Sequence, residues 1–342
     1  MFTLVSPDQS TVPFPEKDGE VPCRFGYPVF QKSGVVDLLG NGNDLALEAT
    51  AEHYSAQWGP EVAFLDFIER NPKALQFMPS GRLGWPGLFD RIRERSRDRL
   101  TLVFDAGCGY GGIFSRLFAD RVPEHLGYLG ADIHLALSAI KRPAGVPLSI
   151  ARFVRWDISR PLPVVQQFDY VICRNALMHT PDPPRTLRSL AARLKRGGTI
   201  AVSVYARKPL LREIVDDGLR ARIVPLATPE ALALARQFTS LARDLQASSG
   251  KIVISDDLPF FGIKRGEYGI HEFLYDNIIK CWHNPTFGEK YSDIVNFDWY
   301  HPPYAYRFMR DEIVGWFEEL GLRVTVAESI PAQHYIEAVK KA

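Results

Sequence analysis

The sequence predicts an α/β fold in which strands and helices alternate around a parallel, doubly wound sheet. Between residues 100 and 205, short apolar runs typical of buried strands alternate with amphipathic runs typical of helices. The same texture returns from about residue 309 to the end. With 46% hydrophobic and 24% charged residues, the chain has an ordinary globular composition and enough apolar material for a large core.

The predicted strands are five apolar runs followed by a closing pair. They cover residues 100–107, 126–132, 151–157, 168–174 and 199–205, and then 322–328 and 333–340. The last two runs are too close together for a crossover helix, so we expect them to pair antiparallel.

The predicted helices have apolar residues at intervals of three and four. Residues 183–198 predict a helix that begins at a proline and ends at paired glycines. Residues 112–122 and 309–321 show the same spacing. These helices separate the strands, as a parallel sheet requires.

The predicted organisation has four regions. They are an irregular N-terminal extension with room for a small hairpin (1–45), a helical lid (46–98), an α/β core (99–205 and 308–342) and an inserted cap (206–307). We expect the cap to cover the ligand edge of the sheet and to bind substrate.

The cap combines one long helix with many aromatic residues. The helix is predicted over residues 229–246, with Leu234, Phe238, Leu241 and Leu245 on one apolar stripe. The aromatic residues that follow are Phe273, Tyr275, Trp282, Phe287, Tyr291, Phe297, Trp299, Tyr300, Tyr304 and Tyr306. They are either the core of the insertion itself or the lining for a flat or sugar-like acceptor.

Charge and cysteine usage narrow the class of function. The net charge of +1 and the lack of a basic stripe argue against nucleic acid or an anionic membrane as partner. The four cysteines are scattered and form no C-x-x-C pair, so we expect neither a metal site nor a disulfide framework. Without a signal peptide or a membrane span in the sequence, we expect a cytoplasmic protein with reduced thiols. The pattern says nothing of the oligomeric state.

The stretch "DAGCGYGG", residues 105–112, joins a predicted strand to a predicted helix. Its glycines fit G-x-G-x-x-G, and Asp132 follows Gly112 by 20 residues, as in dinucleotide-binding proteins. Asp105, however, ends the strand two residues before the first glycine. A carboxylate there would repel a pyrophosphate, whereas it suits a ligand that carries an ammonium group.

Two further carboxylates end the next two strands. Asp132 can bind ribose hydroxyls, which fits either kind of cofactor. Asp157 lies between Trp156 and Ile158. There its carboxylate can accept a hydrogen bond from the amino group of an adenine, with the Trp156 indole beside the adenine ring. The alternative for Asp157 is that it only caps the turn that follows.

These motifs together resemble a class I S-adenosylmethionine-dependent methyltransferase. The resemblance rests on "VFDAGCGYGGIF", "GADIH", "RWDIS" and the stretch from "FDYVICRNALMH" to "GGTIAVSVY", and it covers about 100–205 with 309–342 as the closing elements. It implies a Rossmann-like seven-stranded sheet of order 3-2-1-4-5-7-6, with the last strand antiparallel. The tail of the cap and the residues after it are similar to bacterial methyltransferases of saccharides and secondary metabolites.

The resemblance also implies a role for each cofactor residue. Around the methionine part it places Asp105, Gly107, Cys108, Gly109, Asn175 and Ala176; around the ribose, Asp132 and Ile133; around the adenine, Trp156, Asp157 and Ile158. The segment "HYSAQWG" resembles an aromatic helix that relatives lay over the cofactor, which implies that Tyr54 and Trp58 lie near the site.

The implied reaction is methyl transfer from S-adenosylmethionine to a small-molecule acceptor, with S-adenosylhomocysteine as product. We expect an oxygen acceptor, with N- or C-methylation and a non-catalytic partner subunit as alternatives. An NAD-dependent oxidoreductase is disfavoured by Asp105, Asp157 and the antiparallel closing pair. The candidate bases are His179, His283 and His301, and the sequence does not choose among them.

Overall fold

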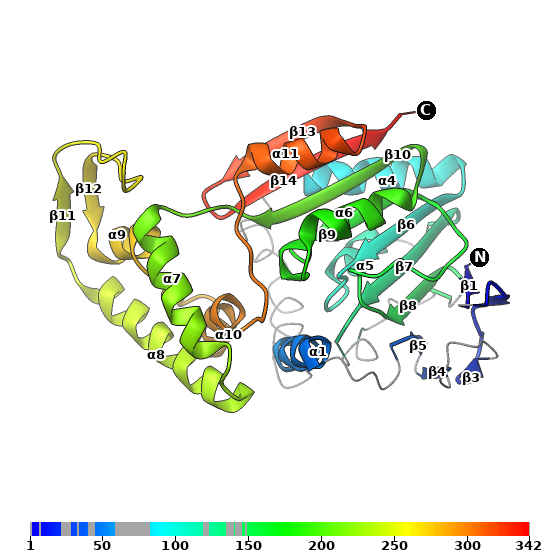
Figure 1. Ribbon diagram of the computed structural model, residues 1–342, viewed down its shortest axis with the longest axis horizontal. Helices are drawn as coiled ribbons and strands as arrows, with labels where there is room; N and C mark the ends of the chain where they lie inside the picture. The colour runs from blue at the N-terminus through cyan, green and yellow to red at the C-terminus, as the bar shows by residue number, and fades with distance from the viewer. Residues whose placement is uncertain are drawn as a thin grey trace. The chain divides into compact units, whose positions relative to one another are not determined.

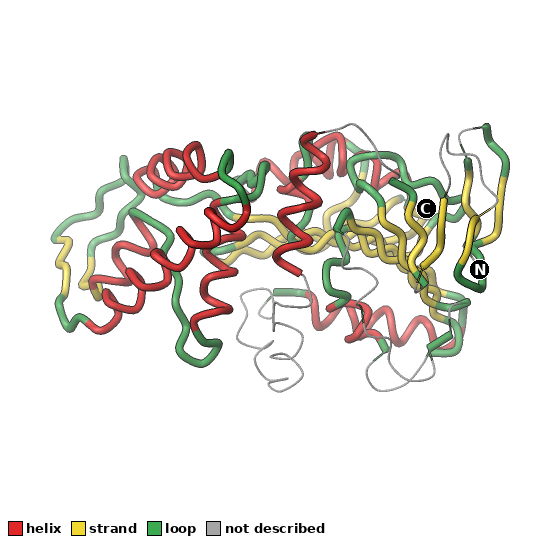
Figure 2. The backbone as a smooth tube through the Cα atoms, turned by 90° about the horizontal axis from the view of Figure 1, so that it is seen from below, coloured by secondary structure: helices red, strands yellow, loops and turns green. Residues whose placement is uncertain are grey.

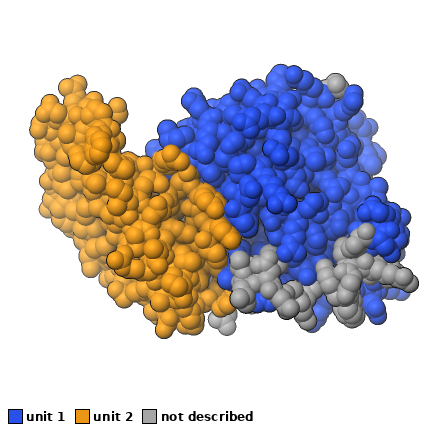
Figure 3. Space-filling model, viewed as in Figure 1, with its two compact units in different colours: residues 1–51, 72–206, 308–342 blue, residues 52–71, 207–307 orange. Residues whose placement is uncertain are grey.

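The protein is described by a computed structural model that divides it into two compact units. The first unit holds residues 1–51, 72–206 and 308–342, and the second holds 52–71 and 207–307 (Figure 3). The described residues are 2–6, 8–21, 29–32, 34–39, 45–58, 83–118, 123–134, 140, 146–147 and 149–341. The helix predicted from "EVAFLDFIERN", residues 61–71, lies outside them.

A ten-stranded sheet forms the centre of the first unit. Its order is β13 (Leu322–Ile330), β14 (Gln333–Lys340), β10 (Leu194–Tyr205), β9 (Phe168–Arg174), β6 (Thr101–Ala106), β7 (Leu126–Asp132), β8 (Ala151–Arg155), β5 (Val35–Asp37), β4 (Val29–Lys32) and β3 (Gly19–Val21). The strands from β10 to β8 are parallel, and β14 runs antiparallel to both of its neighbours. Numbered along the chain from β6, the seven strands from β8 to β13 therefore have the order 3-2-1-4-5-7-6.

The N-terminal region is more regular than the sequence predicts, and it adds three strands to the seven expected ones. β5 pairs parallel with β8, and β4 and β3 continue the sheet from there. β1 (Thr3–Val5) and β2 (Thr11–Pro13) form a separate hairpin. These strands have three or four residues each, too few to show a period, yet Val29 and Val36 are completely buried.

Helices cover both faces of the sheet (Figures 1 and 2). α6 (Pro183–Ala192) and α11 (Arg310–Glu319) contribute apolar side chains to the core on one face. α4 (Trp85–Asp98) and α5 (Gly112–Leu117) do so on the other face. Each fully buried large apolar side chain stabilises the fold by about 1.5–3 kcal/mol. The apolar layers on the two faces of the sheet fix the positions of the parallel strands, so their carboxyl ends lie along one edge.

The helix predicted over residues 183–198 begins where expected but ends earlier, at Ala192. At its start, Asp182 Oδ1 accepts a hydrogen bond from the Arg185 amide at 3.0 Å. After its end, Leu194 already pairs with Phe168 of β9, and a bulge follows before Thr199. The paired glycines therefore shape an irregular strand entry rather than a helix end.

The second unit is mainly helical. It contains α7 (Leu210–Ile223), α8 (Thr228–Ala247), α9 (Ile270–Asn277), α10 (Glu289–Tyr300), the hairpin of β11 (Lys251–Ile254) and β12 (Gly266–Gly269), and the second half of α1 (Leu45–Trp58). The two chain segments that flank the insertion meet each other, because the Phe308 amide donates to the Tyr205 carbonyl at 3.0 Å. Within the described residues, no helix is long and apolar enough to cross a bilayer.

The apolar stripe predicted for α8 is only partly the packing face: Phe238 stacks on Tyr300 of α10, but Leu241 points to solvent. Leu241 is 41% exposed, while the residues that are buried are Ala231, Ala235, Thr239 and Ala242. These smaller side chains let α10 approach closely, and Asn296 Nδ2 of α10 donates to Thr239 Oγ1 at 3.0 Å. A stripe of small residues was not recognised as a packing face because each buries little apolar area by itself.

Candidate active site

The glycine loop follows β6 and has a backbone that few other residues could adopt. Gly107, Gly109 and Gly111 have φ angles of 78°, 51° and 80°. At Gly107 a Cβ atom would lie 2.2 Å from the Cβ of Ala176, well inside van der Waals contact. Glycine is therefore required there both for the turn and for the close approach of the segment after β9.

The amide groups of the loop are used within the protein. Gly107 and Cys108 both donate to the Ala131 carbonyl, at 2.8 and 3.1 Å. The Gly109 amide donates to Asp132 Oδ2 at 2.8 Å. A dinucleotide loop would instead keep such donors for a pyrophosphate. The loop geometry thus agrees with the argument from Asp105.

Asp105 is a completely buried carboxyl group with one oxygen satisfied and one not. Tyr128 OH donates to Oδ2 at 2.5 Å, whereas Oδ1 has no hydrogen-bond partner among the described residues. Burial, with a smaller effect from the Asp132 charge, raises the pKa of Asp105 to about 7. A buried acceptor without a partner costs about 1–3 kcal/mol, so a donor supplied by a ligand would be strongly favoured.

Asp132, at the end of β7, holds the glycine loop in place. Besides the Gly109 amide on Oδ2, the Ile133 amide donates to Oδ1 at 2.8 Å. His134 Nε2 lies 3.0 Å from the Gly109 carbonyl, so this nitrogen carries the proton and donates. A carboxylate has about four lone-pair sites, which leaves capacity on Asp132 for a ligand hydroxyl.

The segment after β8 lies beside the loop. Ile158 Cδ1 is 3.8 Å from the position of a Cβ on Gly107. Asp157 caps its turn, because Oδ1 accepts from the Ser159 amide at 2.9 Å and Oδ2 lies 3.3 Å from Arg160 Nε. Turn capping is therefore part of the role of Asp157. The carboxylate still has acceptor sites left, so the cap is compatible with a contact to adenine.

The segment after β9 contributes an unusual residue. Asn175 has φ 54°, one of two non-glycine residues with positive φ in the described part of the chain. Ser203 Oγ donates to Asn175 Oδ1 at 2.6 Å, and the Asn175 amide donates to the Ser203 carbonyl at 3.1 Å. This conformation turns the chain so that Ala176 contacts Gly107.

Of the three candidate bases, His179 belongs to the first unit, which also holds the glycine loop. It ends the short helix η3 (Leu177–His179) after β9, is 8% exposed, and packs edge-on against Tyr205 with ring centroids 5.4 Å apart. Its amide donates to the Ala176 carbonyl at 3.0 Å. His179 therefore follows directly on the segment that contacts the glycine loop.

His301 and His283 belong to the second unit. His301 is buried, with Nε2 at 3.0 Å from the Leu226 carbonyl and Nδ1 at 2.9 Å from His53 Nδ1. Burial lowers its pKa, and both ring nitrogens are held by the protein. His283 Nδ1 lies 2.8 Å from Gln246 Oε1. These contacts favour a structural role for His301.

Tyr54 and Trp58 lie on α1, in the part that belongs to the second unit. Tyr54 packs edge-on against His53, with ring centroids 4.8 Å apart. The side chain of Trp58 lies outside the described residues. Contact of these two residues with a cofactor stays a prediction.

Three further residues, Tyr128, His134 and Ser203, make site contacts that the sequence alone does not predict. Tyr128 bonds Asp105, His134 bonds the glycine loop, and Ser203 bonds Asn175. The register of β6 against β7 explains the contact of Tyr128. Asp105 of β6 pairs with Gly130 of β7, and Tyr128 lies two residues before Gly130, on the same face of the sheet. This contact becomes predictable only once β6 and β7 are known to be neighbours.

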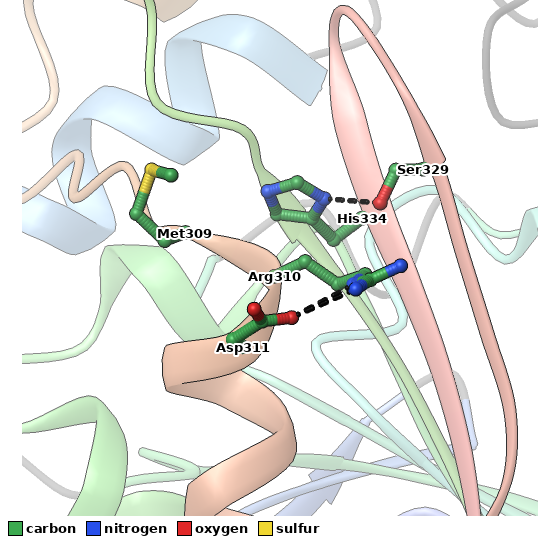
Figure 4. A pocket seen from close by; sticks show the side chains of 5 residues that line it. All are labelled: Met309, Arg310, Asp311, Ser329 and His334. Carbon is green, nitrogen blue, oxygen red and sulfur yellow. Dashed lines mark hydrogen bonds and ion pairs between the residues drawn. The ribbon is translucent and has the colours of Figure 1, made fainter.

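A pocket of about 300 Å³ also lies in the first unit, but it contains none of the predicted site residues. Its lining is Met309, Arg310, Asp311, Ser329 and His334 (Figure 4). His334 is held on both sides, by Ser329 Oγ at 2.8 Å and by the Phe308 carbonyl at 3.0 Å. The polar groups of this pocket thus serve the fold around β14.

Comparison with known families decides the nature of the core, because residues 104–200 match the methyltransferase domain family. This segment is a methyltransferase domain. It contains the glycine loop, Asp132, Asp157 and the β9 segment, so all core residues of the candidate site belong to it except the end of β10. The sheet around the methyltransferase domain has the strand order of the class I fold.

Curated relatives are similar to this chain over less than half of its length. The ubiquinone biosynthesis O-methyltransferase of Pseudomonas syringae pv. tomato is 29% identical over 153 residues, which are 44% of this chain and 59% of that protein. The enzyme of the same name from Pseudomonas fluorescens is 32% identical over an equal length, with the same coverage. The chain thus spans about three-fifths of the length of these relatives.

Solved structures of methyltransferases are similar at low identity. Magnesium protoporphyrin IX methyltransferase from Synechocystis with bound S-adenosylhomocysteine is 14% identical, with a TM-score of 0.41, and the match covers 85% of this chain and 94% of that one. The 1,6-didemethyltoxoflavin-N1-methyltransferase from Burkholderia thailandensis is 13% identical, with a TM-score of 0.38, over 85% and 91% of the two chains.

Proposed function

We propose that the protein is an S-adenosylmethionine-dependent methyltransferase that acts on a small-molecule acceptor. The observation that carries the proposal is the buried Asp105 Oδ1, which lies where the glycine loop begins and has no donor in the part of the chain that the structure describes. An amino-acid ammonium group would supply that donor. The match of residues 104–200 to the methyltransferase domain family supports the same conclusion.

The other residues at this edge fit the remaining parts of the cofactor. Of about four lone-pair sites, Asp132 has one left for a ribose hydroxyl after three amide donors, and Asp157 has two left for the adenine amino group. Trp156 and Ile158 flank Asp157 and offer apolar surface to the base. The close contact of Gly107 with Ala176 would leave the methionine part in contact with backbone rather than with side chains.

The cofactor, when bound, supplies a methyl group on a positively charged sulfur, which an acceptor nucleophile can attack in line. The protein then has to align the acceptor, exclude water and, for a hydroxyl acceptor, remove a proton. His179 is our candidate for the proton acceptor, because a neutral imidazole suits this task near neutral pH. His283 stays a second candidate, whereas the contacts of His301 disfavour that residue.

We infer an oxygen acceptor, since the curated relatives are named O-methyltransferases. Methylation of nitrogen or carbon by the same site is the alternative, and the sequence of the cap does not separate them. The net charge of +1 supports a small molecule rather than nucleic acid as acceptor. Three described cysteines, Cys108, Cys173 and Cys281, are free and buried, which supports a cytoplasmic enzyme.

Calorimetric titration tests the cofactor. We expect S-adenosylhomocysteine to bind one site per chain, and NADH to give no heat of binding. Binding of NADH instead would end the proposal in favour of an oxidoreductase. If S-adenosylhomocysteine binds but no methyl transfer to phenolic, sugar or amine acceptors is detected by mass spectrometry, the non-catalytic subunit becomes the better description.

A further inference from the structure

An unusual concentration of positive charge surrounds Trp299 in the second unit. The cations are Lys280 Nζ, Arg212 Cζ, Arg307 Cζ and Lys208 Nζ, at 4.5, 5.5, 5.8 and 5.9 Å from the ring centroid. We call these four residues and Trp299 the Trp299 cluster. Attraction to the indole stabilises each cation by about 0.5–2 kcal/mol but does not neutralise its charge.

The two guanidinium groups of the cluster have carboxylate partners. Arg212 Nε lies 2.9 Å from Asp216 Oδ2, and Arg307 Nε lies 2.9 and 3.0 Å from the two oxygens of Glu213. Asp216 is completely buried and also accepts from Trp299 Nε1 at 2.8 Å. The carboxylates nearest the ring are therefore engaged by arginine.

Lys280 differs from the arginines. Among the described residues, no carboxylate oxygen lies within 4.0 Å of its ammonium nitrogen, and its contact with Trp299 is the closest of the four. Burial and the Arg212 charge lower the pKa of Lys280 to about 8. Burial, Arg212 and Lys280 together lower the pKa of Lys208 to about 7. Nearby carboxylates oppose these shifts, Glu213 and Asp276 at Lys208 and Asp298 and Asp216 at Lys280, so burial is the main cause at both ammonium groups.

A ligand can supply Lys280 with the anionic partner that the described residues do not provide within 4.0 Å. Lys208 and Lys280 are each partly exposed, while Trp299 is only 5% exposed and forms the buried side of the cluster. We propose that the Trp299 cluster is an anion-binding subsite that takes a carboxylate or phosphate group of a small molecule, with Lys280 as its main contact. Bound there, the anion would pair with Lys280 in a charge-assisted hydrogen bond.

This inference rests on the proposed function in one respect only: the anion would belong to the acceptor, which makes the acceptor class acidic. Anion binding itself does not depend on methyl transfer. The two proposals can therefore fail separately.

The test is calorimetric titration of the whole protein with inorganic phosphate and, in a second arm, with succinate, at a fixed chloride concentration. We expect saturable binding of at least one anion with one site per chain. Lys280→Met should weaken it at least tenfold, and Lys280→Arg should retain most of it. The stronger of the two arms tells a phosphate-bearing acceptor from a carboxylic acid.

Lys264→Met is the matched control, because Lys264 is exposed in the turn between β11 and β12 and should leave affinity unchanged. Equal affinity in both methionine variants, or no saturable binding of either anion to the wild type, would overturn the subsite. Binding of S-adenosylhomocysteine is measured on the same samples. If it persists while anion binding fails, only the subsite is refuted.

Proton uptake gives a readout that a purely structural lysine would not. A bound anion raises the pKa of Lys280, so binding at pH 8 should take up a fraction of a proton, seen as a dependence of the heat on buffer ionisation enthalpy. The charged or titratable groups that act on Lys208 and Lys280 are Arg212, Glu213, Asp216, Asp276, Cys281 and Asp298. Lys208→Met serves as a second variant if Lys280→Met does not fold; unchanged affinity in it would also count against the subsite.

Discussion

At the scale of single residues, Asp105 shows how the site trades stability for binding. Its carboxyl group is completely buried, and only one oxygen has a donor. Such a group destabilises the protein without ligand and gains a partner when the ligand arrives. The effect is local, because Tyr128 is the side chain that donates to it.

We expect Asp105→Asn to weaken S-adenosylhomocysteine binding about 10–100-fold, because a charge-assisted hydrogen bond contributes about 1.5–3 kcal/mol. In the wild type, affinity should fall about tenfold per pH unit below 7, as Asp105 takes up a proton that an ammonium ligand must displace. Calorimetry between pH 5.5 and 8 checks both. Asp90→Asn, exposed on α4, is the control that should change neither.

The substitution Asp105→Asn should also raise the thermal stability of the protein without ligand. The pKa of Asp105 is about 7 in the folded protein and near 3.8 in the unfolded chain, so the folded state holds an extra proton between these values. Stability therefore falls as the pH rises from about 4 to 7. We expect Asp105→Asn to have a higher Tm than the wild type at pH 8 and an equal Tm near pH 4, by scanning calorimetry; a lower Tm at pH 8 contradicts the argument.

Gly107 tests the close approach in the loop. We expect Gly107→Ala to abolish detectable S-adenosylhomocysteine binding, because its Cβ would overlap Ala176 and push the loop away from Asp105. Gly197 has a similar φ of 72° but nothing within 4 Å of the same atom. Gly197→Ala should thus cost only backbone strain of about 1–2 kcal/mol and leave the affinity unchanged. Equal loss of affinity in both variants would show that strain alone is responsible.

At the scale of elements, buried polar groups join the helices of the second unit. Asp216 of α7 accepts from Trp299 Nε1 and Tyr300 OH of α10, at 2.8 and 2.9 Å. α8 meets α10 through small side chains and through Phe238, which stacks on Tyr300 with centroids 4.4 Å apart. Several of the predicted aromatic residues of the cap therefore form the core of the unit itself.

Neighbouring acids on α7 allow a matched prediction. Asp216→Asn should destabilise the protein by about 3–5 kcal/mol, because it leaves the buried Arg212 charge without a carboxylate. Asp217 pairs with Arg307 but is 62% exposed, so Asp217→Asn should cost less than about 1 kcal/mol. Urea unfolding measures both. A similar cost for the two variants would mean that burial of the pair is not what matters.

At the scale of the whole molecule, the insertion leaves and re-enters the core at one place. Ala206 and Phe308 form a parallel bridge, so the flanking chain ends are already adjacent within the first unit. We expect that replacing residues 207–307 by a linker of about four Gly and Ser residues keeps S-adenosylhomocysteine binding and removes methylation of any acceptor. Calorimetry and a methylation assay check this. Loss of cofactor binding with the fold intact would show that the core site needs the insertion.

The sequence by itself determined the strands of the α/β core and the carboxylate residues at their ends. Each long apolar run between residues 100 and 205 became a parallel strand, and Asp105, Asp132 and Asp157 follow or end three of them, because period and strand ends are local properties of the chain. The tertiary structure decided the rest. It added β3–β5 to the sheet, gave Asp105 its partner Tyr128, and gathered four cations around Trp299. These are contacts between residues far apart in the chain, and their energies depend on burial and register, which no local pattern contains.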